Sequence, residues 1–140
     1  MKKLLAIPAV LLFVFAACTK SNNTATTPLN EMLPPDSAPL FTGVFMNGPF
    51  GSVSGKAAVQ VENGQYTLAL QDVKISNGPD LHVYLSRELQ PVNFIDLGKL
   101  KSTAGNQLYN IGGIPDPAAF KYALIHCQQY NHLFGSAALK

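Results

Sequence analysis

Charged residues are scarce in this chain of 140 residues, of which 13% are Asp, Glu, Lys or Arg. Ten Lys and Arg stand against eight Asp and Glu, which gives a formal net charge of +2 at pH 7. The basic residues form no cluster beyond Lys2-Lys3 at the start of the chain. We therefore expect no nucleic-acid partner, and no attraction to a membrane surface through charge alone.

Patterns that accompany common catalytic chemistry are also missing. The sequence has no Cys-x-x-Cys-His haem attachment motif and only two cysteines. It has no spacing that indicates a Ser/His/Asp triad, a pair of catalytic carboxylates or a glycine-rich phosphate loop. A classical enzyme is therefore not indicated, and no cofactor is required. Haem or copper would need single cysteine or histidine side chains as ligands.

A hydrophobic run long enough to cross a membrane is missing as well. The chain opens "MKKLLAIPAVLLFVFAAC", in which the apolar run from Leu4 to Phe15 is short of the roughly 20 residues of a span and contains Pro8. Two lysines, a short apolar run and small residues are typical of a secretory signal peptide, which we place at residues 1–17. Its removal takes two positive charges away.

The end of this segment predicts a lipid anchor. The motif "FAAC" resembles a bacterial lipobox, in which Cys18 is acylated and becomes the first residue of the mature protein. The alternative is a cleaved signal peptide in which this cysteine stands by chance. An acylated Cys18 forms no disulfide, so Cys127 would be the one thiol of the folded domain. Several acyl chains would hold the protein at a membrane.

The residue after the anchor indicates a compartment. Lipoproteins that this chain resembles often carry aspartate at this position when they stay in the inner membrane, and here the residue is Thr19. No acidic run follows Cys18 of the kind that directs some lipoproteins to the outside. We therefore expect an outer-membrane lipoprotein that faces the periplasm.

Residues 18–39 differ in composition from the rest of the chain. They are rich in Ser, Thr, Asn and Pro and poor in large apolar residues, which is typical of a flexible tether. Such a tether spans roughly 25 Å. Residues 40–140 then form one domain of ordinary size, without internal repeats.

The folded region shows an apolar period of two, which predicts β-strands. Asn63-Gly64 stands between two alternating runs and is a strong hairpin signal. The alternation slips between Leu70 and Val73, which indicates a bulge. We expect a single antiparallel β-sandwich or barrel-like domain of roughly eight short strands. The clearest runs are "FTGVFM", "VSGKAAVQV", "YTLAL", "LHVYLS", "FIDL", "QLYNI" and "KYALIHC".

Three segments resemble successive signatures of the DM13 domain family. They are "GPDLHVYLS", "IDLGKLKSTAGNQLYNI" and "FKYALIHCQQYNHLFGSAAL", and the resemblance runs from about Phe41 to Leu139. It implies an all-β domain that takes part in electron transfer, with Cys127 as a redox thiol or as a ligand to a prosthetic group. The chain departs from the family at His126, where members commonly carry tryptophan.

Several side chains could surround the thiol. Neighbours on a strand point to opposite faces, so Cys127 should share a side with Ile125 and not with His126. His132 could approach Cys127 if the chain turns between them, and Tyr130 would then lie on the rim. We name His126, His132, His82 and Tyr130 as possible rim or ligand residues.

A copper site is one alternative. Cys127, His132 and His82 could supply the thiolate and two imidazoles of a blue-copper centre. Such a centre also has a weak axial methionine, but residues 133–136 contain none and Met46 lies far upstream.

Three hypotheses therefore stand side by side. The first is a membrane-anchored redox module that uses Cys127 and exchanges electrons with a redox partner protein or a small ligand. The second is a non-catalytic binding or envelope-structural lipoprotein in which Cys127 is buried and inert, since free cysteine often packs as a small apolar residue. The third is metal binding at Cys127, His132 and His82.

Overall fold

The computed structural model describes residues 23–112, 116 and 118–140, which form β-strands and loops but no helix. Cys18 and the expected signal peptide lie outside these residues. No helix in the described part is long and apolar enough to span a membrane. The strands are β1 (Leu29–Asn30), β2 (Pro39–Asn47), β3 (Val53–Glu62), β4 (Gln65–Ile75), β5 (Leu81–Ser86), β6 (Phe94–Lys99), β7 (Ala104–Ile111), β8 (Tyr122–Cys127) and β9 (His132–Ala138).

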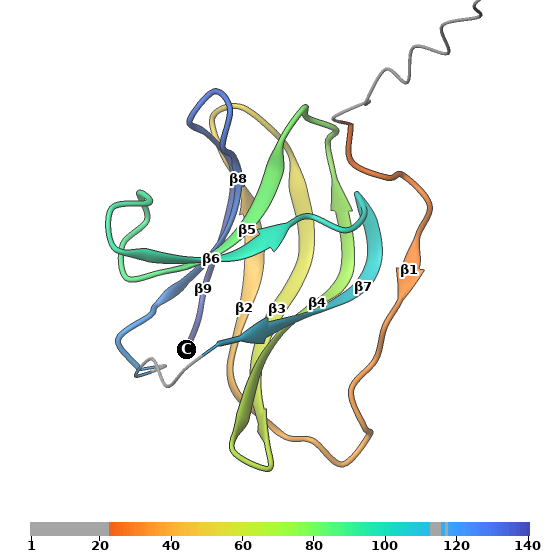
Figure 1. The fold of residues 1–140 in the computed structure, drawn as a ribbon, viewed down its shortest axis with the longest axis vertical. Helices are drawn as coiled ribbons and strands as arrows, with labels where there is room; N and C mark the ends of the chain where they lie inside the picture. The colour runs from red at the N-terminus through yellow and green to blue at the C-terminus, as the bar shows by residue number, and fades with distance from the viewer. Residues whose placement is uncertain (1–22, 113–115, 117) are drawn as a thin grey trace, which may run out of the picture.

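All nine strands belong to one sheet in the order β1-β7-β4-β3-β2-β9-β8-β5-β6. The sheet turns its corner in β2, which pairs with β3 over Pro39–Val44 and with β9 over Phe45–Asn47. The two halves therefore curl toward each other around a common interior (Figure 1). The predicted all-β, barrel-like class is confirmed. Every pairing is antiparallel except that of β1 with β7.

The predicted hairpin joins β3 to β4. Asn63 and Gly64 have φ angles of 50° and 77°, so both adopt the left-handed conformation of a tight two-residue turn. Residues on either side pair directly, with Glu62 opposite Gln65. The hairpin prediction is confirmed.

The predicted slip in β4 is a bulge. The register between β4 and β7 shifts between Leu70 and Val73, and Asp72 takes a φ of 49°. Gly55 lies across from this bulge on β3 with a φ of 110°. A Cβ atom at Gly55 would lie 2.6 Å from the carbonyl oxygen of Gln71, so the close approach of the two backbones requires glycine here.

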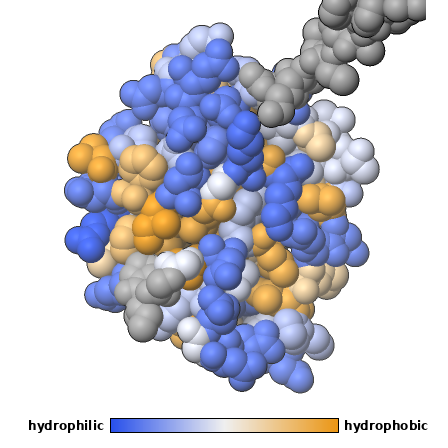
Figure 2. All heavy atoms as spheres, in the orientation of Figure 1, coloured by the Kyte–Doolittle hydropathy of each residue, from blue (hydrophilic) through white to orange (hydrophobic). Residues whose placement is uncertain are grey.

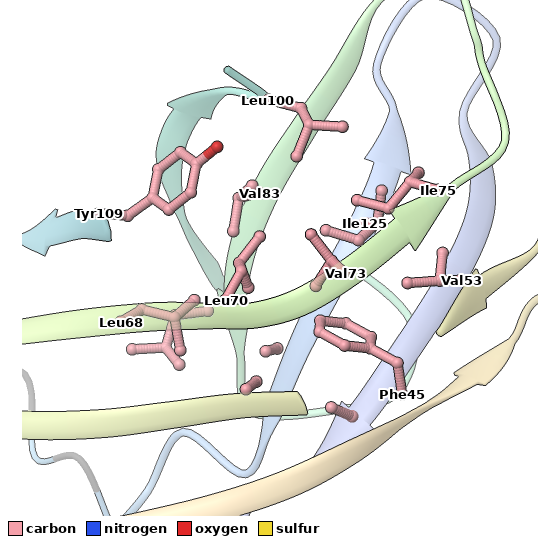
Figure 3. Close-up of a cluster of buried hydrophobic side chains, with 14 of the residues drawn as sticks. Phe45, Val53, Leu68, Leu70, Val73, Ile75, Val83, Leu100, Tyr109 and Ile125 are labelled. Carbon is pink, nitrogen blue, oxygen red and sulfur yellow. The ribbon is translucent and has the colours of Figure 1, made fainter. Parts of the chain in front are cut away.

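The core fills the space inside the curl. Figure 3 shows apolar side chains from β3, β4 and β7 meeting side chains from β5 and β8. The members least accessible to solvent include Leu68, Leu70, Val83, Ile111 and Ile125, each 0% exposed. One cluster thus holds both halves of the sheet together, since burial of apolar area is the main stabilising contribution in such a domain.

Two strands lie outside the predicted runs. In β9, Gly135 and small residues weaken the alternation of apolar and polar side chains that marks a strand. Glycine is nevertheless needed at this position, because a Cβ atom at Gly135 would lie 2.5 Å from the side chain of Val53. The other strand, β1, falls in the segment expected as a flexible tether and runs parallel to β7.

Further hydrogen bonds hold this N-terminal segment in place. The carbonyl oxygen of Ala25 accepts from the backbone of Thr103, and that of Thr27 accepts from the hydroxyl of Ser102. Figure 1 shows the segment running beside β7. It therefore covers backbone groups that would otherwise be left at the edge of the sheet.

Candidate functional site

Cys127 is the last residue of β8 and the free cysteine of the described part of the chain. Its side chain is 1% exposed and belongs to the main core cluster, together with Ile125 from the same face of the strand. Its neighbours in the sheet are Leu81 on β5 and His132 on β9. The sulfur therefore lies at the end of a strand but beneath the surface, and a reagent reaches it only if the surrounding chain opens.

Aromatic side chains gather at the turn that follows β8. The ring of His132 stacks on that of Phe50 with centroids 3.7 Å apart and an interplanar angle of 2°. The ring of Tyr130 lies 5.9 Å from that of His132, measured between centroids, and is tilted by 30°. Phe50 is 54% exposed and Tyr130 57%. We call these three residues the aromatic tip. Because Cys127 and His132 are paired, the tip is the exposed feature next to the thiol.

His126 and His82 lie away from Cys127, on the opposite face of the sheet. They occupy paired positions of β8 and β5, so their side chains project from the same face. The ring of Tyr84 lies 5.2 Å from His126 and 6.2 Å from His82, and stacks on Phe94 at 4.3 Å. We call His82, His126 and Tyr84 the imidazole cluster. It is buried, with 7%, 4% and 2% of these residues exposed.

Carboxylates flank His82 within this cluster. Its Nδ1 lies 3.0 and 2.9 Å from the two carboxylate oxygens of Asp96, so Nδ1–H donates to a group that can only accept. Its Nε2 lies 3.4 Å from Oδ1 of Asp80 but makes no hydrogen bond. Lys99 approaches the same oxygen at 3.5 Å. Asp96 therefore fixes the orientation of the His82 ring.

Burial makes the rest of the cluster neutral. It lowers the pKa of His126, to which the charges of His132 and His82 add, while the side chain of Asn131 opposes the shift. The Nδ1 of His126 has no hydrogen-bond partner. Burial, followed by the negative charge of Asp96, raises the pKa of Tyr84. At neutral pH the His126 ring is uncharged and Tyr84 keeps its proton.

The geometry does not assemble the copper ligands considered from the sequence. Cys127 faces the core while His82 lies on the other face, because alternate residues of a strand point in opposite directions. Across residues 23–112, 116 and 118–140, no group of three or more His, Cys, Asp and Glu side chains could hold a metal ion.

Comparison with known families now identifies the domain. The family model described as "Electron transfer DM13" matches residues 47–139, most of the chain. The chain belongs to the DM13 family. No curated protein and no solved structure matches it. The matched range contains Cys127, the aromatic tip and the imidazole cluster.

Part of the DM13 signature has a structural role in this chain. The hydroxyl of Tyr109 accepts from the backbone N–H of Lys101 and donates to Gln107, whose amide donates to the carbonyl oxygen of Ser102. The ammonium of Lys101 lies over the ring of Tyr109 and binds Glu31. Burial raises the pKa of Tyr109, which keeps its proton. Gln107 and Tyr109, from the segment "IDLGKLKSTAGNQLYNI", therefore fasten the β6–β7 connection, and Lys101 links it through Glu31 to the N-terminal segment.

One cleft of this DM13 domain lies away from the thiol. A cleft of about 420 Å³ separates the segment Glu31–Pro39 from the outer face of β2, β3, β4 and β7, with Ala58 and Ala69 among its lining residues. On the face drawn in Figure 2, hydrophilic side chains break the hydrophobic surface into small areas. Among the described residues of that face, the apolar areas are therefore small and separate.

Sequence reasoning missed Tyr84, Asp96 and Asp80 as partners of the histidines. Tyr84 and His82 are two residues apart on β5, a spacing that could have placed them on one face. Asp96 is brought to His82 by the pairing of β5 with β6, which no local pattern reveals.

Proposed function

We propose that this protein is a lipid-anchored electron-transfer module of the cell envelope in which Cys127 is the redox-active group. The observation that carries the proposal is the position of Cys127 within a DM13 domain. It is a free thiol at the end of β8, paired with His132 of the exposed aromatic tip. A partner that docks on this tip would contact the residue paired with Cys127.

Access to the sulfur requires local opening in this proposal. The side chain is 1% exposed, while the turn of residues 128–131 beside it is exposed. Segments with few buried contacts open at a lower free energy than the whole domain. Opening of this turn would expose Cys127 without unfolding the sheet.

Alkylation of the native full-length chain by iodoacetamide tests this mechanism. We expect Cys127 to react faster than global unfolding allows, with a rate that changes little as urea is added, because local opening exposes little new surface. Trp is absent, so unfolding is followed in parallel by circular dichroism. A rate that follows global unfolding, with the same dependence on urea, contradicts the proposal.

The proposal of a membrane anchor rests on the N-terminal sequence, which ends in the lipobox-like motif "FAAC". Acylation at Cys18 would attach the protein to the outer membrane, facing the periplasm, where a redox partner protein or a small redox-active ligand would meet the domain. The residues between the anchor and β1 would hold the domain near the lipid headgroups.

A second function is favoured by the burial of the sulfur. Cys127 is part of the apolar core, as expected of an inert packing residue in a binding or envelope-structural lipoprotein. Cys127→Ala should cost about 1 kcal/mol or more under either function, because it leaves a small cavity. Loss of stability alone therefore does not separate the two functions, whereas alkylation does.

A further inference from the structure

The imidazole cluster contains two buried nitrogen atoms without partners. They are Nε2 of His82 and Nδ1 of His126, on residues that are 7% and 4% exposed. A buried polar atom without a hydrogen bond is unfavourable, so two on neighbouring residues call for an explanation. The two residues are directly paired across β5 and β8.

The pairing brings the two rings together. Directly opposed residues of an antiparallel pair have Cβ atoms about 4.5–5.5 Å apart and project from the same face. Tyr84 lies within 6.2 Å of both rings, measured between centroids, and packs beside them. The rings of His82 and His126 therefore project from neighbouring positions on the outer face of the sheet, and each has one buried nitrogen without a hydrogen-bond partner.

The surroundings of His82 match those of a metal-binding histidine. Metal-ligating histidines usually donate their other ring N–H to a carboxylate, which fixes the tautomer and turns the free nitrogen toward the metal. Here Nδ1–H donates to Asp96, and Nε2 makes no hydrogen bond, although Oδ1 of Asp80 lies 3.4 Å from it. In the neutral imidazole that nitrogen carries a lone pair.

Charge and ligand number narrow the choice of ion. Asp80 and Asp96 flank His82, and Lys99 approaches Asp80, so among these three charged residues one negative charge is in excess. This balance favours a monovalent cation. Zinc and copper(II) require three or more protein ligands, and no such group exists in the described ranges. Copper(I) binds imidazole and is stable with two ligands in a line.

We propose that His82 and His126 form a two-coordinate site for copper(I), with Asp96 as the residue that positions His82. The site lies across the sheet from Cys127 and uses neither that thiol nor His132. Binding of the ion stands on the geometry of the cluster. A role for the ion in electron exchange rests on the proposed function of the domain.

Competition for copper(I) tests the site. The full-length, metal-free protein is titrated with copper(I) under anaerobic conditions in the presence of a coloured copper(I) chelator. We expect about one tightly held ion, with His82→Gln and His126→Gln each weakening binding by about tenfold or more. Asp96→Asn should weaken it by roughly 10–100-fold while both imidazoles remain.

Matched controls separate this site from other ligands. His132→Gln removes the third histidine, which lies in the aromatic tip, and Cys127→Ala removes the thiol; we expect both to bind copper(I) as the wild type does. Weakened binding in Cys127→Ala, equal binding in His82→Gln and His126→Gln, or no retained copper would each overturn the proposal.

X-ray absorption of the copper-loaded wild type gives a readout that does not depend on any variant. The proposal predicts two nitrogen neighbours and no sulfur around the ion. A sulfur neighbour, or a shell of four or more light atoms, would overturn it. If the copper(I) proposal fails, the proposed redox role of Cys127 still stands or falls by its own alkylation experiment.

Discussion

At the scale of single residues, β8 presents a thiol on one face of the sheet and an imidazole on the other. Cys127 points into the core, while His126 beside it points to the outer face with His82 and Tyr84. The histidine that stands where DM13 proteins commonly carry tryptophan is therefore no direct neighbour of the sulfur. The imidazole of His126 is a polar group in a buried position. Because burial lowers its pKa, its protonation is coupled to folding.

His126 should make stability depend on pH. Its pKa is lowered in the folded state, mainly by burial, so below about pH 6.5 the unfolded chain binds more protons than the folded chain. Stability should then fall as the pH drops from 7 toward the lowered pKa. We expect His126→Gln to reduce this fall, as measured by urea unfolding at pH 7 and pH 5.

The half-buried histidine of the tip, His132, serves as the comparison. His132→Gln should leave most of the pH dependence in place, because the pKa of His126 is lowered mainly by the burial of its own ring. An identical fall in stability for wild type and His126→Gln would show that other groups cause it.

At the scale of elements, the turn of the β3–β4 hairpin requires an unusual backbone conformation at Gly64. Gly64 has a φ of 77°, and a Cβ there would meet no atom within 4 Å. Any cost of a side chain at Gly64 is therefore the cost of the left-handed conformation, without a steric contact.

Gly64→Val should destabilise the domain by about 1 kcal/mol or more, because β-branched residues tolerate this conformation poorly. The urea midpoint measures the effect. Gly112→Val is the matched control, since Gly112 also has open space around it but no positive φ. Equal midpoints for the two variants would contradict the assigned turn.

The elements also show how far sequence reasoning extends. The Asn63-Gly64 turn, the slip near Asp72 and the opposite faces of Cys127 and His126 follow from local pattern, and the structure has all three. The strand β9 and the pairing of His82 with His126 do not follow, because they depend on contacts between distant segments. Burial of the sulfur likewise depends on the curl of the whole sheet.

At the scale of the whole molecule, the N-terminal segment belongs partly to the fold. Glu31 binds Lys101, and this hydrogen bond is the main cause that lowers the pKa of Glu31. β1 extends the sheet beyond β7. An anchor at Cys18 would therefore hold the domain by a shorter free stretch than residues 18–39 suggest.

The anchor is tested by Cys18→Ser in the full-length chain. We expect the variant to leave the membrane fraction or to remain unprocessed, because the acylated side chain is gone. Incorporation of labelled palmitate and separation of membranes measure this. A variant that still takes up palmitate and stays with the membrane would show that Cys18 is not the anchor.

Electron transfer through Cys127 is the central claim, and voltammetry of the full-length protein tests it most directly. The protein is treated with a metal chelator and adsorbed on an electrode, and wild type is compared with Cys127→Ala. We predict an oxidation wave in the wild type that is lost in Cys127→Ala while the circular dichroism spectrum stays the same. The same wave in both proteins, or no wave in the wild type, would contradict the claim.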